Sequence, residues 1–142
     1  MRPRDLDINE LIALLETEHE RIRSTLVELG VLLESGETEK AMDLIRGMDE
    51  TLIQHMLDEE ATLLRELIRA FGREGAWESI EVFQEHADID RLIKELKKSI
   101  DAANANVAEL SAGLSDFLRN HFQKEHTMVF PCVRDAERKL AG

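Results

Sequence analysis

The stretches His55-Met-Leu-Asp-Glu59 and His121-Phe-Gln-Lys-Glu125 share one spacing, a histidine followed four residues later by a glutamate. Positions i and i+4 lie on the same face of an α-helix, so each stretch presents an imidazole and a carboxylate side by side. Such a pair can bind one metal ion through both side chains. The two stretches therefore predict helices that carry metal ligands.

Two further histidines extend this spacing into a repeat. His19 lies 36 residues before His55, and His86 lies 35 residues before His121. The chain thus contains a duplicated unit, a histidine followed by HxxxE, with an offset of 66 to 67 residues. A random scatter of five histidines would rarely produce this arrangement, so we treat these positions as one candidate site.

The composition limits the class of protein. A chain of 142 residues is about the size of one domain, and we expect a single domain over residues 1–142. The apolar content of 43% and the low number of prolines, two, are typical of soluble helical proteins. The net charge of −12 disfavours binding to nucleic acid or to anionic lipid.

The expected compartment is the cytoplasm. No apolar run approaches the roughly 18 residues that a membrane span needs, and Met1 to Asp5 lacks the apolar stretch of a signal peptide. The single cysteine, Cys132, excludes an internal disulfide framework and a cysteine-based metal site. We expect Cys132 to be a small apolar filler, and any bound metal to use nitrogen and oxygen ligands.

Apolar residues recur with a 3.6-residue period through four long stretches, and no stretch alternates as a strand would. The expected helices run from Asp7 to the Ser35-Gly36 break, from about Thr38 to Phe71-Gly72, from after Gly75 to about Ala103, and from the region Asp101 to Asn106 to Phe130-Pro131. Asp7 caps the first helix with Glu10, and Pro131 ends the fourth. An amphipathic tail over Val133 to Leu140 adds a short fifth piece.

Short connections force neighbouring helices to be antiparallel, which predicts an all-α, up-down-up-down four-helix bundle with a short C-terminal tail helix and a core over about residues 8–131. One stripe on each helix has steps of three or four residues. The stripes are Leu11, Leu15, His19, Ile22, Leu26, Leu29 and Leu33; Met48, Leu52, His55, Glu59, Leu63 and Leu67; Val82, His86, Ile89, Ile93, Leu96 and Ile100; and Val107, Leu110, Leu114, Phe117, His121, Glu125 and Met128. The four histidines and both glutamates therefore fall at core positions, near one level of the bundle.

Two buried carboxylates need positive charge nearby, because an unpaired ionised carboxylate costs several kcal/mol to bury. No lysine or arginine lies on these stripes, and a buried histidine tends to lose its proton. Two metal ions satisfy both requirements, with Glu59 and Glu125 able to bridge them. The ligand types leave iron, manganese and zinc open. The alternative without metal is a helical interaction module whose polar core layer sets the register.

The pattern closely resembles the hemerythrin-like HHE cation-binding domain over about Ile8 to Pro131. The resemblance implies a four-helix bundle around a non-haem centre of two iron ions, which an oxo group can bridge, rather than manganese or zinc. By this resemblance the ligands are His19 from the first helix, His55 and Glu59 from the second, His86 from the third, and His121 and Glu125 from the fourth. The stretch HFQKEHTMVFP over residues 121–131 also resembles the end of the family's fourth helix.

Two positions depart from the oxygen-carrying members of that family. Those members have HxxxH on the third helix, where this chain has His86-Ala-Asp-Ile-Asp90, and an aspartate where this chain has His126. The departures argue against reversible oxygen carriage. For His126 a ligand role, a role beside a ligand and a solvent-facing position all remain open. We expect Asp90 to face solvent or to orient a ligand histidine through a hydrogen bond, rather than to bind metal.

The resemblance implies a protein that binds, senses or reacts with dioxygen, nitric oxide or peroxide, or that handles iron. We expect apolar residues such as Leu52, Phe83 and Phe117 to wall the open coordination position, which favours a small uncharged ligand. An enzyme with peroxidase, nitric oxide reductase or iron-repair activity is the alternative. The chain has no tyrosine, so tyrosyl-radical chemistry is not expected.

Overall fold

A computed structural model describes residues 6–142, and almost all of them are helical. The α-helices are α1 (Ile8–Glu34), α2 (Thr38–Asp58), α3 (Arg65–Gly75), α4 (Trp77–Asp101), α5 (Val107–Lys124) and α6 (Phe130–Ala141). Two π-helical segments, η1 (Glu59–Leu64) and η2 (Glu125–Val129), join α2 to α3 and α5 to α6. Residues 6–142 contain no strand, as the sequence predicts.

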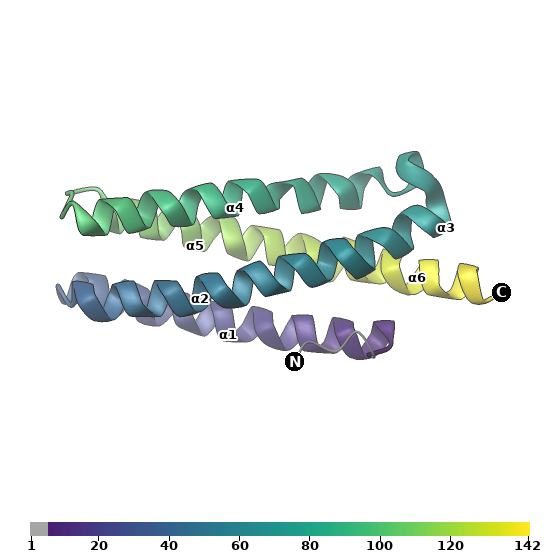
Figure 1. Cartoon of the computed structure of the whole chain (residues 1–142), viewed down its shortest axis with the longest axis horizontal. Coiled ribbons are helices and arrows are strands. Elements are labelled where there is room, and N and C mark those ends of the chain that lie inside the picture. Colours follow the sequence, from purple (N-terminus) through teal and green to yellow (C-terminus); the bar gives the residue numbers. More distant parts are fainter. Residues whose placement is uncertain (1–5) are drawn as a thin grey trace.

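The helices form the predicted antiparallel bundle. Figure 1 shows α1 and α2 below α4 and α5, with α3 turning upward from the end of α2 towards the start of α4. Each of the four long helices packs against two neighbours, α1 against α2 and α5, and α4 against α5 and α2. Helix α6 continues the line of α5 and packs against α3.

The two ends of α1 and the interruption of α3 lie where the capping residues and glycines of the sequence predict them. Asp7 and Glu10 form the predicted capping box, in which the amide of Glu10 donates to Asp7 Oδ1 at 2.8 Å and the amide of Asp7 donates to Glu10 Oε1 at 3.3 Å. Gly36 follows α1 with φ of 74°, and Gly72 interrupts α3 with φ of 73°. Glycine adopts this left-handed backbone without a steric penalty, so both predicted breaks occur where expected.

The prediction that Pro131 ends the fourth helix is wrong. Helix α6 begins at Phe130 and continues to Ala141 with Pro131 in its first turn. Proline is tolerated in a first turn because the amide hydrogen that it lacks has no α-helical partner there. The π-helical segment η2 ends just before Phe130, so Pro131 lies in the first turn of a new α-helical segment. The predicted tail helix therefore continues the line of α5 and η2 instead of following a break.

The core consists of two apolar clusters on either side of a buried polar layer. The turn-side cluster, next to the α1–α2 and α4–α5 connections, includes Leu26, Ile45, Leu52 and Leu114. The corner-side cluster, next to α3, includes Leu11, Leu67, Val82 and Phe130. The predicted stripes are buried along α1, α2 and α4, except that Leu33 is only partly buried.

The predicted stripe on the fourth helix agrees least with the structure. Val107, Leu110, Phe117 and Met128 are only partly buried. Leu118 and Val129, one residue after Phe117 and Met128, are fully buried instead. Steps of three and of four residues both return to the same helix face, so the sequence pattern does not distinguish these neighbouring positions.

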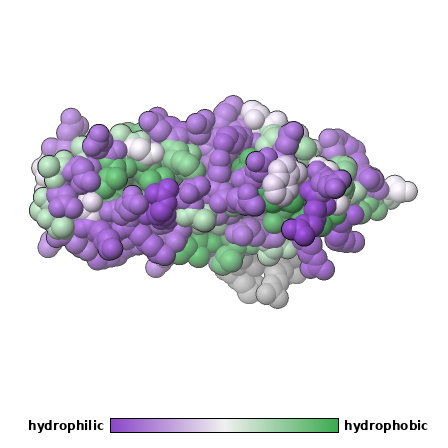
Figure 2. Space-filling model, turned by 90° about the horizontal axis from the view of Figure 1, so that it is seen from above, coloured by the Kyte–Doolittle hydropathy of each residue, from purple (hydrophilic) through white to green (hydrophobic). Residues whose placement is uncertain are grey.

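Of the helices between residues 6 and 142, none combines the length and apolar character that a bilayer span requires. Figure 2, which views the molecule from above, shows a mainly hydrophilic surface with smaller hydrophobic areas between the polar side chains.

Candidate metal centre

The buried polar layer contains all six residues that the sequence predicts as ligands. Each of the four long helical segments of the bundle contributes at least one of them: His19 from α1, His55 and Glu59 from the α2–η1 junction, His86 from α4, and His121 and Glu125 from the α5–η2 junction. All six side chains are buried, and both glutamates have no exposed surface. The structure thus brings the duplicated unit together around one point.

The donor atoms form two groups that share both glutamates. His19, His55, Glu59 and Glu125 make one group, and His86, His121, Glu59 and Glu125 make the other, with the candidate ligand atoms of each group within 4.8 Å of one another. The shared oxygens contact imidazoles from both pairs. Glu59 Oε2 lies 3.3 Å from His55 Nε2, and Glu59 Oε1 lies 3.0 Å from His86 Nε2. Two carboxylates between two pairs of imidazoles can hold two ions.

Glu125 plays the equivalent part on the opposite side. Its Oε1 lies 2.8 Å from His19 Nε2, and its Oε2 lies 3.5 Å from His121 Nε2. The duplicated sequence unit therefore corresponds to an approximate twofold arrangement of donors.

Despite these close contacts, several buried polar atoms of the layer form no hydrogen bond among residues 6–142. They are both carboxylate oxygens of Glu59, both of Glu125, and the Nε2 atoms of His86 and His121. A buried polar group without a partner costs about 1–3 kcal/mol, and more when it is charged. A cation bound between these atoms would satisfy all of them, so the residues present fit a metal centre.

Three glutamates outside the six donors orient the imidazoles. Glu18 Oε1 lies 3.0 Å from His55 Nδ1, Glu60 Oε2 lies 3.2 Å from His86 Nδ1, and Glu85 Oε1 lies 3.0 Å from His121 Nδ1. A carboxylate at Nδ1 accepts a hydrogen bond from Nδ1–H, which leaves the Nε2 lone pair free to bind metal. In all three histidines Nε2 is the atom that faces the shared glutamates.

Glu18, Glu60 and Glu85 are not among the residues predicted from the sequence, although the repeat contains a signal for two of them. Glu18 precedes His19 and Glu85 precedes His86, so the duplicated unit begins with Glu-His in both copies. Each of these glutamates serves the HxxxE histidine of its own copy, His55 or His121. Helical spacing within one helix does not reveal a contact that crosses to the next helix.

Burial and the glutamates act in opposite directions on the imidazoles. Burial lowers the pKa of His19 below its ordinary value despite its contact with Glu125. Burial also disfavours the charged form of His55, but the nearby glutamates, Glu59 first among them, raise its pKa well above the ordinary value. Burial together with Glu125 raises the pKa of Glu59. Without a cation, the environment thus favours the protonated forms of His55 and Glu59, and metal binding competes with those protons.

Aromatic and aliphatic side chains surround the layer. Phe122 is fully buried, and its ring stacks on the His19 ring with 4.0 Å between centroids and 16° between planes. Of the predicted wall residues, Leu52 and Phe83 are buried, and the Phe83 ring lies 5.5 Å from that of His86. Phe117 is only partly buried against the turn-side cluster, so Phe122 provides the aromatic contact expected of Phe117.

His126 and Asp90 lie outside the donor groups. The His126 side chain is 62% exposed, and its Nδ1 lies 3.0 Å from Glu16 Oε2. Asp90 is paired with Lys94 at 2.7 Å on the exposed side of α4. The orienting role expected of Asp90 is filled at His86 and His121 by Glu60 and Glu85 instead.

Both shared glutamates are the first residues of π-helical segments, Glu59 of η1 and Glu125 of η2. Single π turns inside α-helices occur frequently at functional sites. Here the same irregularity appears at the same place in both copies of the unit, immediately after the HxxxE spacing.

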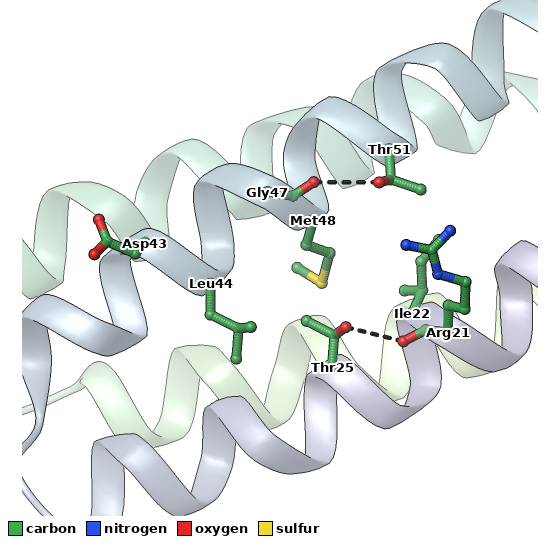
Figure 3. A pocket seen from close by; sticks show the side chains of 8 residues that line it. All are labelled: Arg21, Ile22, Thr25, Asp43, Leu44, Gly47, Met48 and Thr51. Carbon is green, nitrogen blue, oxygen red and sulfur yellow. Dashed lines mark hydrogen bonds between the residues drawn. The ribbon is translucent and has the colours of Figure 1, made fainter.

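An open groove lies between α1 and α2, next to the turn-side cluster (Figure 3). It has a volume of about 230 Å³ and is lined by Arg21, Ile22, Thr25, Asp43, Leu44, Gly47, Met48 and Thr51. The Thr25 and Thr51 hydroxyls donate to the backbone oxygens of Arg21 and Gly47, at 2.9 and 3.2 Å. None of the six donors lines this groove.

The sequence of the chain is similar to one known protein family. The model described as the hemerythrin HHE cation binding domain matches residues 10–133. No curated protein and no solved structure matches the chain.

Proposed function

Since the chain belongs to the hemerythrin HHE cation-binding family, we propose that it binds two iron ions in the buried layer and uses them to bind, sense or react with a small oxidant. The observation that carries the proposal is the sharing of Glu59 and Glu125 between two donor groups. Two ions held by two common carboxylates match the requirement of a dinuclear centre.

The donors divide naturally between the two ions. His19 and His55 would hold one ion, His86 and His121 the other, and Glu59 and Glu125 both. Bound iron would supply redox chemistry and a coordination position for an added ligand. The chain contributes orientation of the imidazoles through Glu18, Glu60 and Glu85, and exclusion of bulk water by the two apolar clusters.

The walls of the site favour a small ligand of low charge. The layer is closed off by buried residues including Leu52, Phe83 and Phe122, which offer no hydrogen bonds to a polar substrate. Dioxygen, nitric oxide and peroxide are small enough for such surroundings. Steady turnover of one of them with a reductant would identify an enzyme, whereas stoichiometric binding would identify a sensor or a storage protein.

The decisive experiment is metal analysis of protein produced in iron-replete cells, together with an absorption spectrum. We expect about two iron atoms per chain and an oxo-bridge charge-transfer band. His55→Ala and Glu125→Ala should each lose most of the metal. His126→Ala is the matched control, because it removes an exposed histidine next to Glu125 and should leave loading unchanged.

The proposal would fail if purified wild-type protein, supplied with ferrous salt under anaerobic conditions, retained no iron. Retention of zinc or manganese in preference to iron would refute the choice of metal while keeping the site.

A further inference from the structure

The two donor groups are equivalent in sequence but differ in their surroundings. We call the position between His19, His55 and the two shared glutamates the α1/α2 position, and the position between His86, His121 and the same glutamates the α4/α5 position. Because both positions use Glu59 and Glu125, any difference between them must come from the histidines and from what those histidines contact.

The first difference lies in the outer carboxylates. Both histidines of the α4/α5 position have one, since Glu60 contacts His86 Nδ1 and Glu85 contacts His121 Nδ1. At the α1/α2 position only His55 has such a partner, Glu18. Among the described residues no carboxylate lies at Nδ1 of His19, whose polar contacts all involve Nε2.

The sequence shows why His19 lacks this partner. In the duplicated unit, Glu60 follows the shared Glu59 and contacts the lone histidine of the other helix pair, His86. The equivalent residue after Glu125 is His126, which is exposed and contacts Glu16 instead. The replacement of a glutamate by a histidine at this single position makes the two halves of the layer unequal.

The second difference lies in the Nε2 atoms that face the interior. At the α4/α5 position the Nε2 atoms of His86 and His121 lie 3.0 and 3.5 Å from oxygens of the shared glutamates but form no hydrogen bond among residues 6–142. At the α1/α2 position the Nε2 atoms of His19 and His55 lie 3.1 Å apart and form a hydrogen bond with each other. A cation at the α4/α5 position therefore relieves unsatisfied nitrogens, whereas one at the α1/α2 position must first displace an existing hydrogen bond.

We propose that the two positions fill in a fixed order, with the first metal ion at the α4/α5 position and the second at the α1/α2 position. The inference rests on the proposed function, because it concerns the same two ions. Lys124 strengthens the first position by fixing Glu85, since its Nζ lies 2.7 Å from Glu85 Oε2 while Oε1 serves His121. The second ion enters beside the first, where repulsion between the ions weakens its binding further.

The test is an anaerobic titration of the metal-free full chain with Fe²⁺ in competition with a chromogenic chelator, which measures both binding steps without reference to activity. Wild-type protein should show a tighter and a weaker step. His19→Ala should retain the tighter step and lose the weaker one, while His121→Ala should lose the tighter step.

Two more conservative variants keep all six donors and are therefore less prone to unfold the protein. Glu85→Gln and Glu18→Gln alter equivalent positions of the duplicated unit without removing a donor. Glu85→Gln should weaken the tighter step about 10- to 100-fold, the usual range for an outer partner of a metal ligand, and Glu18→Gln should weaken only the second step. Glu81→Gln, which removes an exposed charge one turn away on α4, should change neither step.

The order of filling is overturned if His19→Ala, rather than His121→Ala, removes the tighter step, or if Glu18→Gln and Glu85→Gln weaken the same step equally. Either result leaves the proposed function standing, because iron still binds. Absence of any binding step in the wild-type protein would overturn the proposed function as well.

Discussion

The buried polar layer and the turn-side cluster next to it are both shielded from solvent, yet they contribute to the stability of the fold in opposite ways. In the turn-side cluster, residues such as Leu52 and Ile45 are fully buried and contact other apolar side chains. Burial of each such side chain contributes about 1.5–3 kcal/mol. In the polar layer, burial of Glu59 and Glu125 removes carboxylates from water and leaves their oxygens without hydrogen bonds from the described residues.

The comparison shows that position in the bundle does not decide whether a buried residue stabilises the fold. The apolar cluster stabilises the protein under any ionic conditions, whereas the polar layer does so only with a cation between its donors. Site and fold can therefore be perturbed separately, and four experiments measure how far this separation holds.

Removal of metal should have the largest effect. A ligand present at about 1,000 times its Kd stabilises the folded state by about 4 kcal/mol, which corresponds to a change in Tm on the order of 10 °C for a chain of this size. We expect the iron-loaded protein to lose this increment when a chelator is added, as measured by thermal melting followed by circular dichroism. Glu125→Ala should melt at one temperature with or without chelator. Equal Tm values for loaded and chelated wild-type protein would contradict the prediction.

Ile45→Ala should be costly whether or not metal is bound. Ile45 is fully buried in the turn-side cluster, ten residues before His55, and an isoleucine-to-alanine change in a core costs about 2–5 kcal/mol. Urea denaturation of loaded and chelated protein should show similar losses. Leu57→Ala is the matched control on the same helix, because Leu57 is 55% exposed and its loss should cost no more than about 0.5 kcal/mol. A loss confined to the loaded protein would show that the two regions are coupled.

Glu59→Gln should increase the stability of the metal-free protein and decrease that of the metal-loaded protein. In chelated protein the substitution removes a buried carboxylate whose charge is disfavoured by burial and by the neighbouring Glu125, and it should raise the urea midpoint slightly. In loaded protein the same change removes a shared donor and should abolish the stabilisation by metal. The measurement is the urea midpoint in each state, with Glu50→Gln on the exposed face of α2 as control. Destabilisation of the chelated protein would mean that the fold itself needs the carboxylate.

Gly47→Ala should produce the smallest effect, and the same one in both states. Gly47 lies in the interior of α2 beside the groove of Figure 3, and a Cβ built there meets no atom within 4 Å. Replacement of an interior helical glycine by alanine stabilises a helix by about 0.5–1 kcal/mol. Gly36→Ala is the opposing control, since its φ of 74° strains an L side chain and should make that variant less stable. A change in metal content of Gly47→Ala would contradict the separation of fold and site.

The sequence predicts the bundle and the grouping of the six donors because both depend on helical periodicity. A period of 3.6 residues places His19, His55 and Glu59 on inward faces, and the short connections bring those faces together. The capping box at Asp7 and the break at Gly72 are also local signals, and both are confirmed.

The features that the sequence analysis missed depend on departures from that period or on contacts between helices. The π-helical segment that begins at Glu125 lets the helix continue through Pro131, and Val129 is buried in the core where the sequence predicts Met128. The stack of Phe122 on His19 and the hydrogen bond of Glu85 with His121 join different helices, so no spacing within one helix encodes them.

The π turns at Glu59 and Glu125 also determine where the chain tolerates a change in length. Loss of one residue within η1, at Ala61 for example, would convert the wide turn into an ordinary α turn and leave the segments on either side facing the same way. The middle of α2 contains no wide turn that could absorb the loss of one residue. A deletion there would rotate every later side chain by about 100° around the helix axis. Single-residue deletions are therefore best accommodated immediately beside the glutamates, and least accommodated in the regular helices that appear simpler.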